Sequence, residues 1–152
     1  MAKYTGSGGR FEIQTVASPA TWVAVGQVRE IGSASITSEE IDVTTLDDNV
    51  SGTSTDYKDF LGGFKDPGEL GIVVLFDPNL ASHGTATNGL YELFDTSRSI
   101  VARVVYPTSP VNYLTVTGFF RDWETPAINA TDPVESTFVF RLRQKPVLSA
   151  GV

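Results

Sequence analysis

Apolar and polar residues alternate with a period of two along most of this chain, and many of the apolar positions are β-branched or aromatic. Such alternation is typical of strands whose two faces meet different environments. Glycine, proline, asparagine or aspartate bounds each run, as expected at turns. The pattern predicts a mostly β fold, a β-sandwich or barrel, with strands in seven runs: Phe11 to Val16, Thr21 to Glu30, Ala34 to Thr45, Glu69 to Phe76, Ile100 to Tyr106, Val111 to Trp123 and Ser136 to Arg143.

One segment has helical spacing instead. Leu90, Leu93 and Phe94 recur at positions i, i+3 and i+4, behind Thr87 or Asn88 as a possible N-cap. The apolar stripe is narrow, so we expect one short helix that flanks the sheet and covers one side of it.

The segment from Leu46 to Gly68 breaks the alternation and predicts a long loop between strands. It begins with acidic and small polar residues and ends in Asp66-Pro67-Gly68, which predicts a tight turn. Its aromatic and aliphatic side chains are unfavourable in water, so they either fold back on the core of their own chain or dock on a second chain. Both readings stay open. The residues assigned to this possible contact between subunits are Asp47, Asp48, Tyr57, Phe60, Leu61 and Phe64.

The length of 152 residues fits a single domain. We expect a flexible N-terminal arm over residues 1–10, one β domain over 11–146 and a short C-terminal arm over 147–152. No apolar run approaches the roughly 20 residues that cross a bilayer, and the start of the chain lacks the apolar segment of a signal peptide. These features predict a protein made in the cytoplasm, with no membrane partner.

Charge and composition narrow the possible functions. The net charge of -7 argues against a protein that grips a phosphate backbone, although nucleic acid could still pass it. Cysteine is absent, which excludes disulfides and thiolate metal sites. Five acidic residues could in principle hold calcium, but their spacing does not match the helix-loop-helix pattern, so we interpret them as solvated carboxylates: Asp42, Asp47, Asp48, Asp56 and Asp59.

Candidate catalytic residues are few. His83 is the single histidine, no Gly-x-Ser-x-Gly accompanies it, and we interpret it as a surface residue in a loop. Gly63 and Gly68 have the spacing of a phosphate-binding loop, but Glu69 stands where a lysine is needed and would repel phosphate. The sequence therefore predicts neither an enzyme nor a bound metal or cofactor.

The stretch from Ser33 to Thr44 is polar at nearly every position, although its residues favour a strand. Such a strand pairs with neighbours without entering a core. We expect it in a sheet that lines a water-filled bore, with one sheet edge pairing with the next subunit. Negative charge in that bore would keep DNA from adhering. The residues expected to face the bore are Ser38, Glu39, Glu40 and Asp42.

The order of these features resembles that of the major tail tube proteins of siphophages, and more distantly that of tube proteins of contractile tails and type VI secretion. The resemblance covers about Phe11 to Arg143. It rests on element order and short motifs, namely Ile41-Asp42-Val43-Thr44-Thr45, the long loop, Gly68-Glu69 opening an apolar strand, the single helix, Ile100 to Pro107, and Thr117-Gly118-Phe119.

The resemblance implies hexameric rings that stack into a hollow tube, with inner sheets lining a channel for DNA and with the long loop contacting an adjacent subunit. The implied partners are copies of the chain itself, a tape measure protein, tail terminator and tail tip proteins, and DNA in transit without sequence-specific binding. The implied location is a virion tail assembled in the host cytoplasm. Two alternatives stay open: a monomeric ligand- or carbohydrate-binding β-module, and a head decoration or head-tail joining protein.

Overall fold

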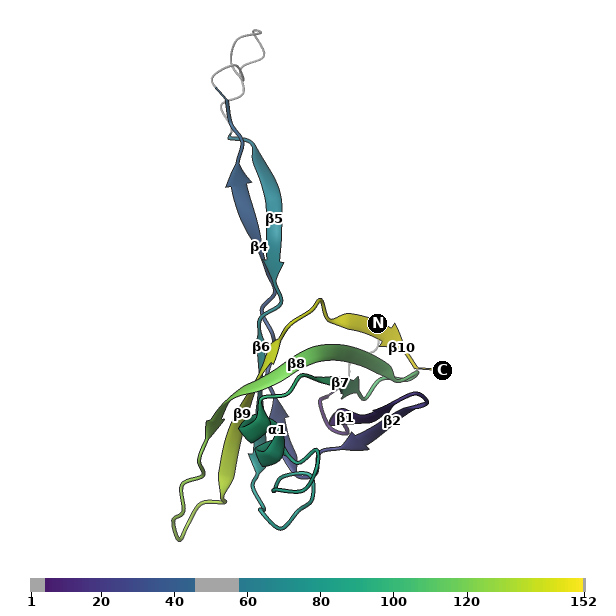
Figure 1. Cartoon of the computed structure of the whole chain (residues 1–152), viewed down its shortest axis with the longest axis vertical. Coiled ribbons are helices and arrows are strands. Elements are labelled where there is room, and N and C mark those ends of the chain that lie inside the picture. The colour runs from purple at the N-terminus through teal and green to yellow at the C-terminus, as the bar shows by residue number, and fades with distance from the viewer. Residues whose placement is uncertain (1–4, 46–57, 152) are drawn as a thin grey trace.

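The computed structural model describes residues 5–45 and 58–151, within which the chain forms ten strands and one helix (Figure 1). Long connections join β6 to α1 and β8 to β9. In chain order the elements are β1 (Arg10–Ala17), β2 (Ala20–Ala24), β3 (Val28–Ile31), β4 (Thr37–Asp42), β5 (Phe60–Asp66), β6 (Glu69–Leu75), α1 (Leu90–Thr96), β7 (Ile100–Tyr106), β8 (Asn112–Glu124), β9 (Glu135–Leu142) and β10 (Val147–Ala150).

Eight of these strands form one antiparallel sheet in the order β2-β1-β7-β8-β9-β6-β3, with β10 paired to β8 beside this path. Strand β8 is 13 residues long and spans two neighbourhoods. Its first part pairs with β7 and β10, whereas its last part pairs with β9. Strands β4 and β5 form a separate two-stranded sheet that projects from the body as a long hairpin (Figure 1).

The core lies inside the curved sheet and is rich in phenylalanine. Phe11, Phe120 and Phe140 are buried and meet edge to face, with ring centroids 5.2 to 6.4 Å apart. The helix adds Leu90 and Leu93, both fully buried, so its narrow apolar face packs against the core as expected. The prediction of a mostly β fold with one short flanking helix is confirmed.

The strand predictions hold best where alternation is cleanest, and β7 has the expected bounds. The run from Thr21 to Glu30 is instead two strands, because the chain turns between them at Gln27, whose φ is 56°. The run from Ala34 to Thr45 shortens to β4. The C-terminal arm is wrong over Val147–Ala150, because these residues pair with Asn112 to Thr115 of β8 as strand β10.

The helix begins without the expected side-chain cap. The N-cap residue is Gly89, which has no side chain that could cap the helix. Neither Thr87 nor Asn88 takes this position. Asn88 has a φ of 66°, and its N–H donates to a Glu92 carboxylate oxygen 3.2 Å away. At the other end, Ser97 adopts a left-handed conformation that closes the helix. Among the described residues no helix is long and apolar enough to cross a membrane.

His83 lies in a connection, as expected, but its predicted exposure is wrong because the ring is fully buried. Its Nδ1 accepts a hydrogen bond from the Asp77 N–H at 3.2 Å, and its Nε2 lies 2.5 Å from the Gly26 carbonyl oxygen. Because Nδ1 accepts, Nε2 is the nitrogen that donates. The ring also stacks on Phe76, with centroids 6.0 Å apart. His83 therefore anchors the long connection before α1 to the β2–β3 turn.

Candidate assembly surfaces

The most prominent surface is the projecting hairpin, which replaces much of the predicted loop. Asp42 pairs with Phe60, Ile41 with Leu61 and Ser38 with Lys65, so the second half of that segment is strand β5. The loop prediction is therefore wrong for Phe60–Asp66. Strand β5 has one residue more than β4 between the Ser38 and Glu40 pairs, which makes a β-bulge that bends the hairpin.

Side chains alternate between the two faces of β4, which divides the residues expected to line a bore. Ser38, Glu40 and Asp42 share one face, whereas Glu39 lies on the other with Ile41. A Cβ built on Gly63 would lie 3.1 Å from the Glu39 Cβ and 3.3 Å from the Ile41 Cδ1, which places these two on one face. Every residue of β4 is exposed. Their orientation toward a bore stays a prediction.

The apolar residues of the hairpin do not fold back on the core. Phe64 is 89% exposed, Leu61 58% and Phe60 48%, and all three lie along β5 and not at a loop tip. For Phe60, Leu61 and Phe64, the first of the two readings, contact with the core of the same chain, is therefore wrong. Docking on a second chain stays a prediction. Asp47, Asp48 and Tyr57 lie outside the described residues, as does Asp56.

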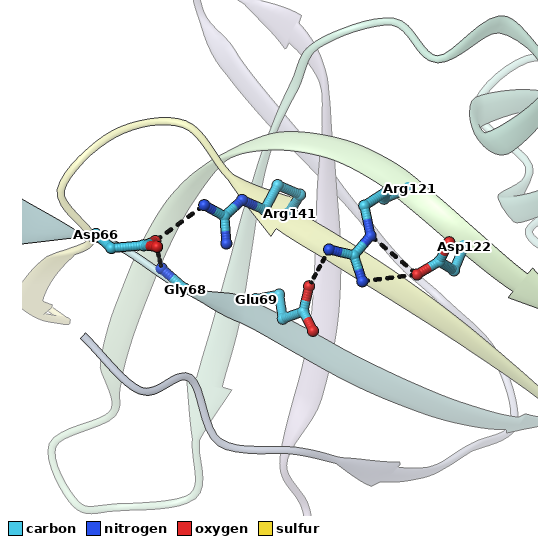
Figure 2. A network of polar contacts seen from close by, with 6 residues as sticks. All are labelled: Asp66, Gly68, Glu69, Arg121, Asp122 and Arg141. Atoms are coloured by element: carbon cyan, nitrogen blue, oxygen red, sulfur yellow. Dashed lines mark hydrogen bonds and ion pairs between the residues drawn. The ribbon is translucent and has the colours of Figure 1, made fainter. Parts of the chain in front are cut away.

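One close crossing of the chain and an ion pair hold the base of the hairpin. Gly68 has a φ of +79°, and a Cβ at this position would lie 2.4 Å from the Ser35 carbonyl oxygen, so the two connections to the hairpin pass in close contact. The predicted tight turn at Asp66-Pro67-Gly68 is wrong, because the chain makes neither a turn nor a bend at Pro67 and Gly68 and passes from β5 into β6. An Asp66 carboxylate oxygen accepts from the Gly68 N–H and from the Arg141 guanidinium, both at 2.9 Å (Figure 2).

A second ion pair group lies beside the first on the body. Arg121 of β8 contacts Glu69 at 2.7 Å and Asp122 at 2.8 Å (Figure 2). Glu69 pairs in register with Arg141, so the two groups meet where β6 leaves the hairpin. Exposed pairs of this kind contribute only about 0 to 1 kcal/mol each, so they orient the base more than they stabilise the fold.

The carboxyl groups at both ends of the hairpin are held in their charged form. The Gly68 N–H, with the Arg141 charge, lowers the pKa of Asp66 below its ordinary value. The Thr44 N–H and hydroxyl lower the pKa of Asp42 in the same way. The Asp122 carboxylate raises the pKa of Arg121. An Asp42 carboxylate oxygen accepts from the Thr44 N–H, whereas Asp59 contacts the Thr44 hydroxyl through its backbone, so Thr44 accounts for the Asp42 carboxylate alone.

Two open sheet edges are a further candidate surface for assembly. The strands β2-β1-β7-β8-β10 form a continuous five-strand layer whose outermost strands, β2 and β10, each have a partner on one side within the described chain. Both edges carry exposed apolar side chains: Val23 is 51% exposed, Val147 56% and Leu148 68%. Unpaired edges with apolar side chains are ready to pair with another chain. The alternation of residues alone does not locate β10, because only four residues form it.

Solved structures match this chain over nearly its full length, although no protein-family model and no curated protein matches its sequence. A protein of the gene transfer agent tail, solved with C6 symmetry, aligns with a TM-score of 0.67 and 12% identity, covering 99% of this chain and 100% of that one. The SPP1 tail tube protein aligns with a TM-score of 0.67 and 8% identity, covering 99% and 81%. The chain has the tail tube fold.

A tube terminator of an extracellular contractile injection system shares this fold, with a TM-score of 0.70, 7% identity and 99% coverage of both chains. The tail tube fold is thus common to proteins that build tubes and proteins that end them. The resemblance to tail tube proteins drawn from the sequence is confirmed at the level of the fold. In this chain the tail tube fold carries an exposed hairpin and two open edges.

Proposed function

We propose that this chain is a structural subunit that assembles into stacked rings, six copies to a ring, and forms a hollow phage tail tube through which DNA passes. The observation that carries the proposal is the tail tube fold with an exposed apolar strand on a projecting hairpin. A closed ring needs a head-to-tail contact between two different surfaces of each copy. The open edges and the hairpin offer surfaces for contacts within and between rings.

Within a ring, the β2 edge of one copy pairs with the β10 edge of the next. Pairing would satisfy the free backbone groups of both edges and cover Val23 and Leu148. The layer contributes five strands per copy, and strands lie about 4.8 Å apart, so six copies give a wall of roughly 144 Å circumference and about 45 Å diameter. Such a wall leaves room for a DNA duplex after side chains are added.

Between rings, the hairpin contacts a subunit of the adjacent ring. It extends beyond the body, where it can reach another copy (Figure 1). Covering Phe60, Leu61 and Phe64 would remove three large apolar side chains from water, at about 1.5 to 3 kcal/mol for each one fully buried. The partners inferred from the family resemblance are a tape measure protein, terminator and tip proteins, and the place of assembly is the host cytoplasm.

The decisive experiment is negative-stain electron microscopy of the purified protein at rising concentration, with its mass followed by light scattering. We expect rings and hollow tubes. A strictly monomeric species at every concentration would contradict self-assembly.

A second candidate is a tube terminator, because the terminator of the contractile injection system shares this fold with a TM-score of 0.70. Rings that do not stack would favour it.

A ligand-binding module is a third candidate, supported by an apolar cavity of about 860 Å³ lined by Leu70, Val104 and Leu114 among others. A monomer that binds small apolar molecules would favour that function.

Replacing Phe60, Leu61 and Phe64 together by serine tests the hairpin contact. We expect the monomer to stay folded, because all three side chains are exposed, and tubes to be lost. Circular dichroism and thermal melting report the fold, and microscopy reports the tubes. Normal tubes from the triple variant would show that the hairpin contact is dispensable, and an unfolded monomer would show that the hairpin supports its own body.

A further inference from the structure

The five-strand layer has one face on the core and one face away from it. Phe11 and Ile13 of β1 point to the core, so Glu12 between them points outward. In register, Glu12 pairs with Arg103 of β7, and Arg103 pairs with Thr115 of β8, so all three lie on the outward face.

Charge on this face is confined to one cluster. Arg10, Glu12 and Arg103 are the charged residues of β2, β1, β7, β10 and residues 112–118 of β8. The Glu12 carboxylate meets both arginines: Oε1 accepts from the Arg103 Nε at 2.6 Å, and Oε2 lies 3.7 Å from the Arg10 Nε. The Glu12 side chain is 10% exposed and that of Arg103 20%.

Two aromatic rings cover the Arg103 guanidinium. Its central carbon lies 4.4 Å from the ring centroid of Trp22 and 4.2 Å from that of Tyr113. Rings at this distance bind a guanidinium through its face, while Glu12 accepts from its Nε. The outward face therefore holds two positive charges and one negative charge, yet leaves little of the Arg103 cation open to a solute.

We propose that, with this outward face toward the bore of the proposed tube, the Glu12, Trp22 and Tyr113 side chains keep Arg103 from holding DNA phosphates. The inference rests on the proposed tube. A layer that closes into a ring through its own edges has the rest of each subunit on its core side, and that bulk must lie outside for the bore to stay open. DNA then passes the face on which Arg103 lies.

Masking has a physical purpose on such a wall. Arginine binds phosphate with a bidentate, charge-assisted contact, and a ring of such contacts would hold DNA in the tube. Glu12 already accepts from the Nε of the Arg103 guanidinium, which is one of the donors that a phosphate would use. One positive charge remains uncompensated on this face, and the Arg10 side chain, which is 52% exposed, is the cation that stays open to solvent.

Single cysteine variants test the orientation, because the native chain has no cysteine. T115C places a thiol on the outward face, and D95C places one on the exposed part of α1, on the core side of the layer. Each variant is treated with a polymer-linked maleimide too large to enter a tube, as monomer and as tubes. We expect assembly to protect T115C and leave D95C reactive. Labelling of T115C in tubes at its monomer rate would overturn the orientation.

The E12Q variant tests the masking. It preserves the shape of the side chain and removes the charge that holds two arginines. We expect E12Q tubes to retain a short fluorescent DNA duplex about tenfold more than wild-type tubes at low salt, protected from nuclease, with the excess lost at high salt. The double variant E12Q/R103Q should return toward wild-type retention.

Equal retention by wild-type and E12Q tubes would overturn the masking. If E12Q does not assemble, Y113L removes one ring while keeping the ion pair, and Y113F keeps the ring as its control. We expect increased retention from Y113L and not from Y113F. Absence of tubes from the wild-type chain would count against the proposed function itself, so the two failures are distinct.

Discussion

Gly68 and Gly71 lie three residues apart but differ in whether a side chain could be accommodated. Gly68 has a positive φ, and the Ser35 carbonyl oxygen lies where a Cβ would stand. Gly71 lies within β6, and a Cβ there would meet nothing within 4 Å. The first glycine is required by the close crossing at the hairpin base, whereas the second is not.

Gly68→Ala and Gly71→Ala therefore form a matched pair. We expect Gly68→Ala to lower the free energy of unfolding by about 1 to 3 kcal/mol, because alanine is strained at this φ and meets Ser35. Gly71→Ala should leave it unchanged or raise it by up to about 1 kcal/mol. Urea denaturation of both variants measures the difference. Equal stability of the two variants would show that the base can relax around a side chain.

At the scale of elements, the hairpin direction depends on how β5 joins β6. Asp66 bonds to Gly68 and Arg141, which ties the end of β5 to β9. Asp122 makes an ion pair on the neighbouring strand without touching the hairpin. A change at Asp66 should therefore affect the hairpin, whereas the same change at Asp122 should not.

We expect Asp66→Asn to increase hydrogen exchange of the β4 and β5 amides and to leave those of β8 and β9 unchanged. Asp122→Asn is the control. Because the folded state lowers the pKa of Asp66, its contribution is complete above the ordinary aspartate pKa and is lost as the pH falls through the lowered value. Acid should therefore reproduce the effect of Asp66→Asn in the wild-type protein. Equal exchange rates of the β4 and β5 amides in Asp66→Asn and Asp122→Asn would contradict a role for Asp66 in holding the base.

At the scale of the whole molecule, the two open edges are the surfaces that join copies in the proposed ring. Val23 pairs with Ile13 and Leu148 pairs with Leu114, so both lie on the core-side face of the layer. Across a joint between β2 and β10 they would be on the same side of the sheet. Charged residues introduced at these two positions would therefore repel or attract each other across the joint.

We expect V23K/L148K to abolish rings, because like charges on paired strands repel, and V23E/L148K to restore them. Each monomer should fold, since both side chains are more than half exposed. Analytical ultracentrifugation compares the two double variants at equal concentration. Assembly that does not depend on the sign of these charges would contradict pairing between β2 and β10.

The sequence by itself determined the elements whose side chains alternate between a buried face and a different second face. Strands β6, β7 and β9 show this pattern, as does the short helix with Leu90 and Leu93. In each case the signal lies within a few neighbouring residues.

Only the tertiary structure decided the features that depend on distant partners. Strand β5 contains Gly62 and Gly63, which disfavour a strand, and pairing with β4 supplies its backbone hydrogen bonds. His83 is buried because Gly26 and Phe76 surround it. Glu12 and Arg103 meet across 91 residues of chain. Local alternation tells which face a side chain takes, but strand order determines what it touches there.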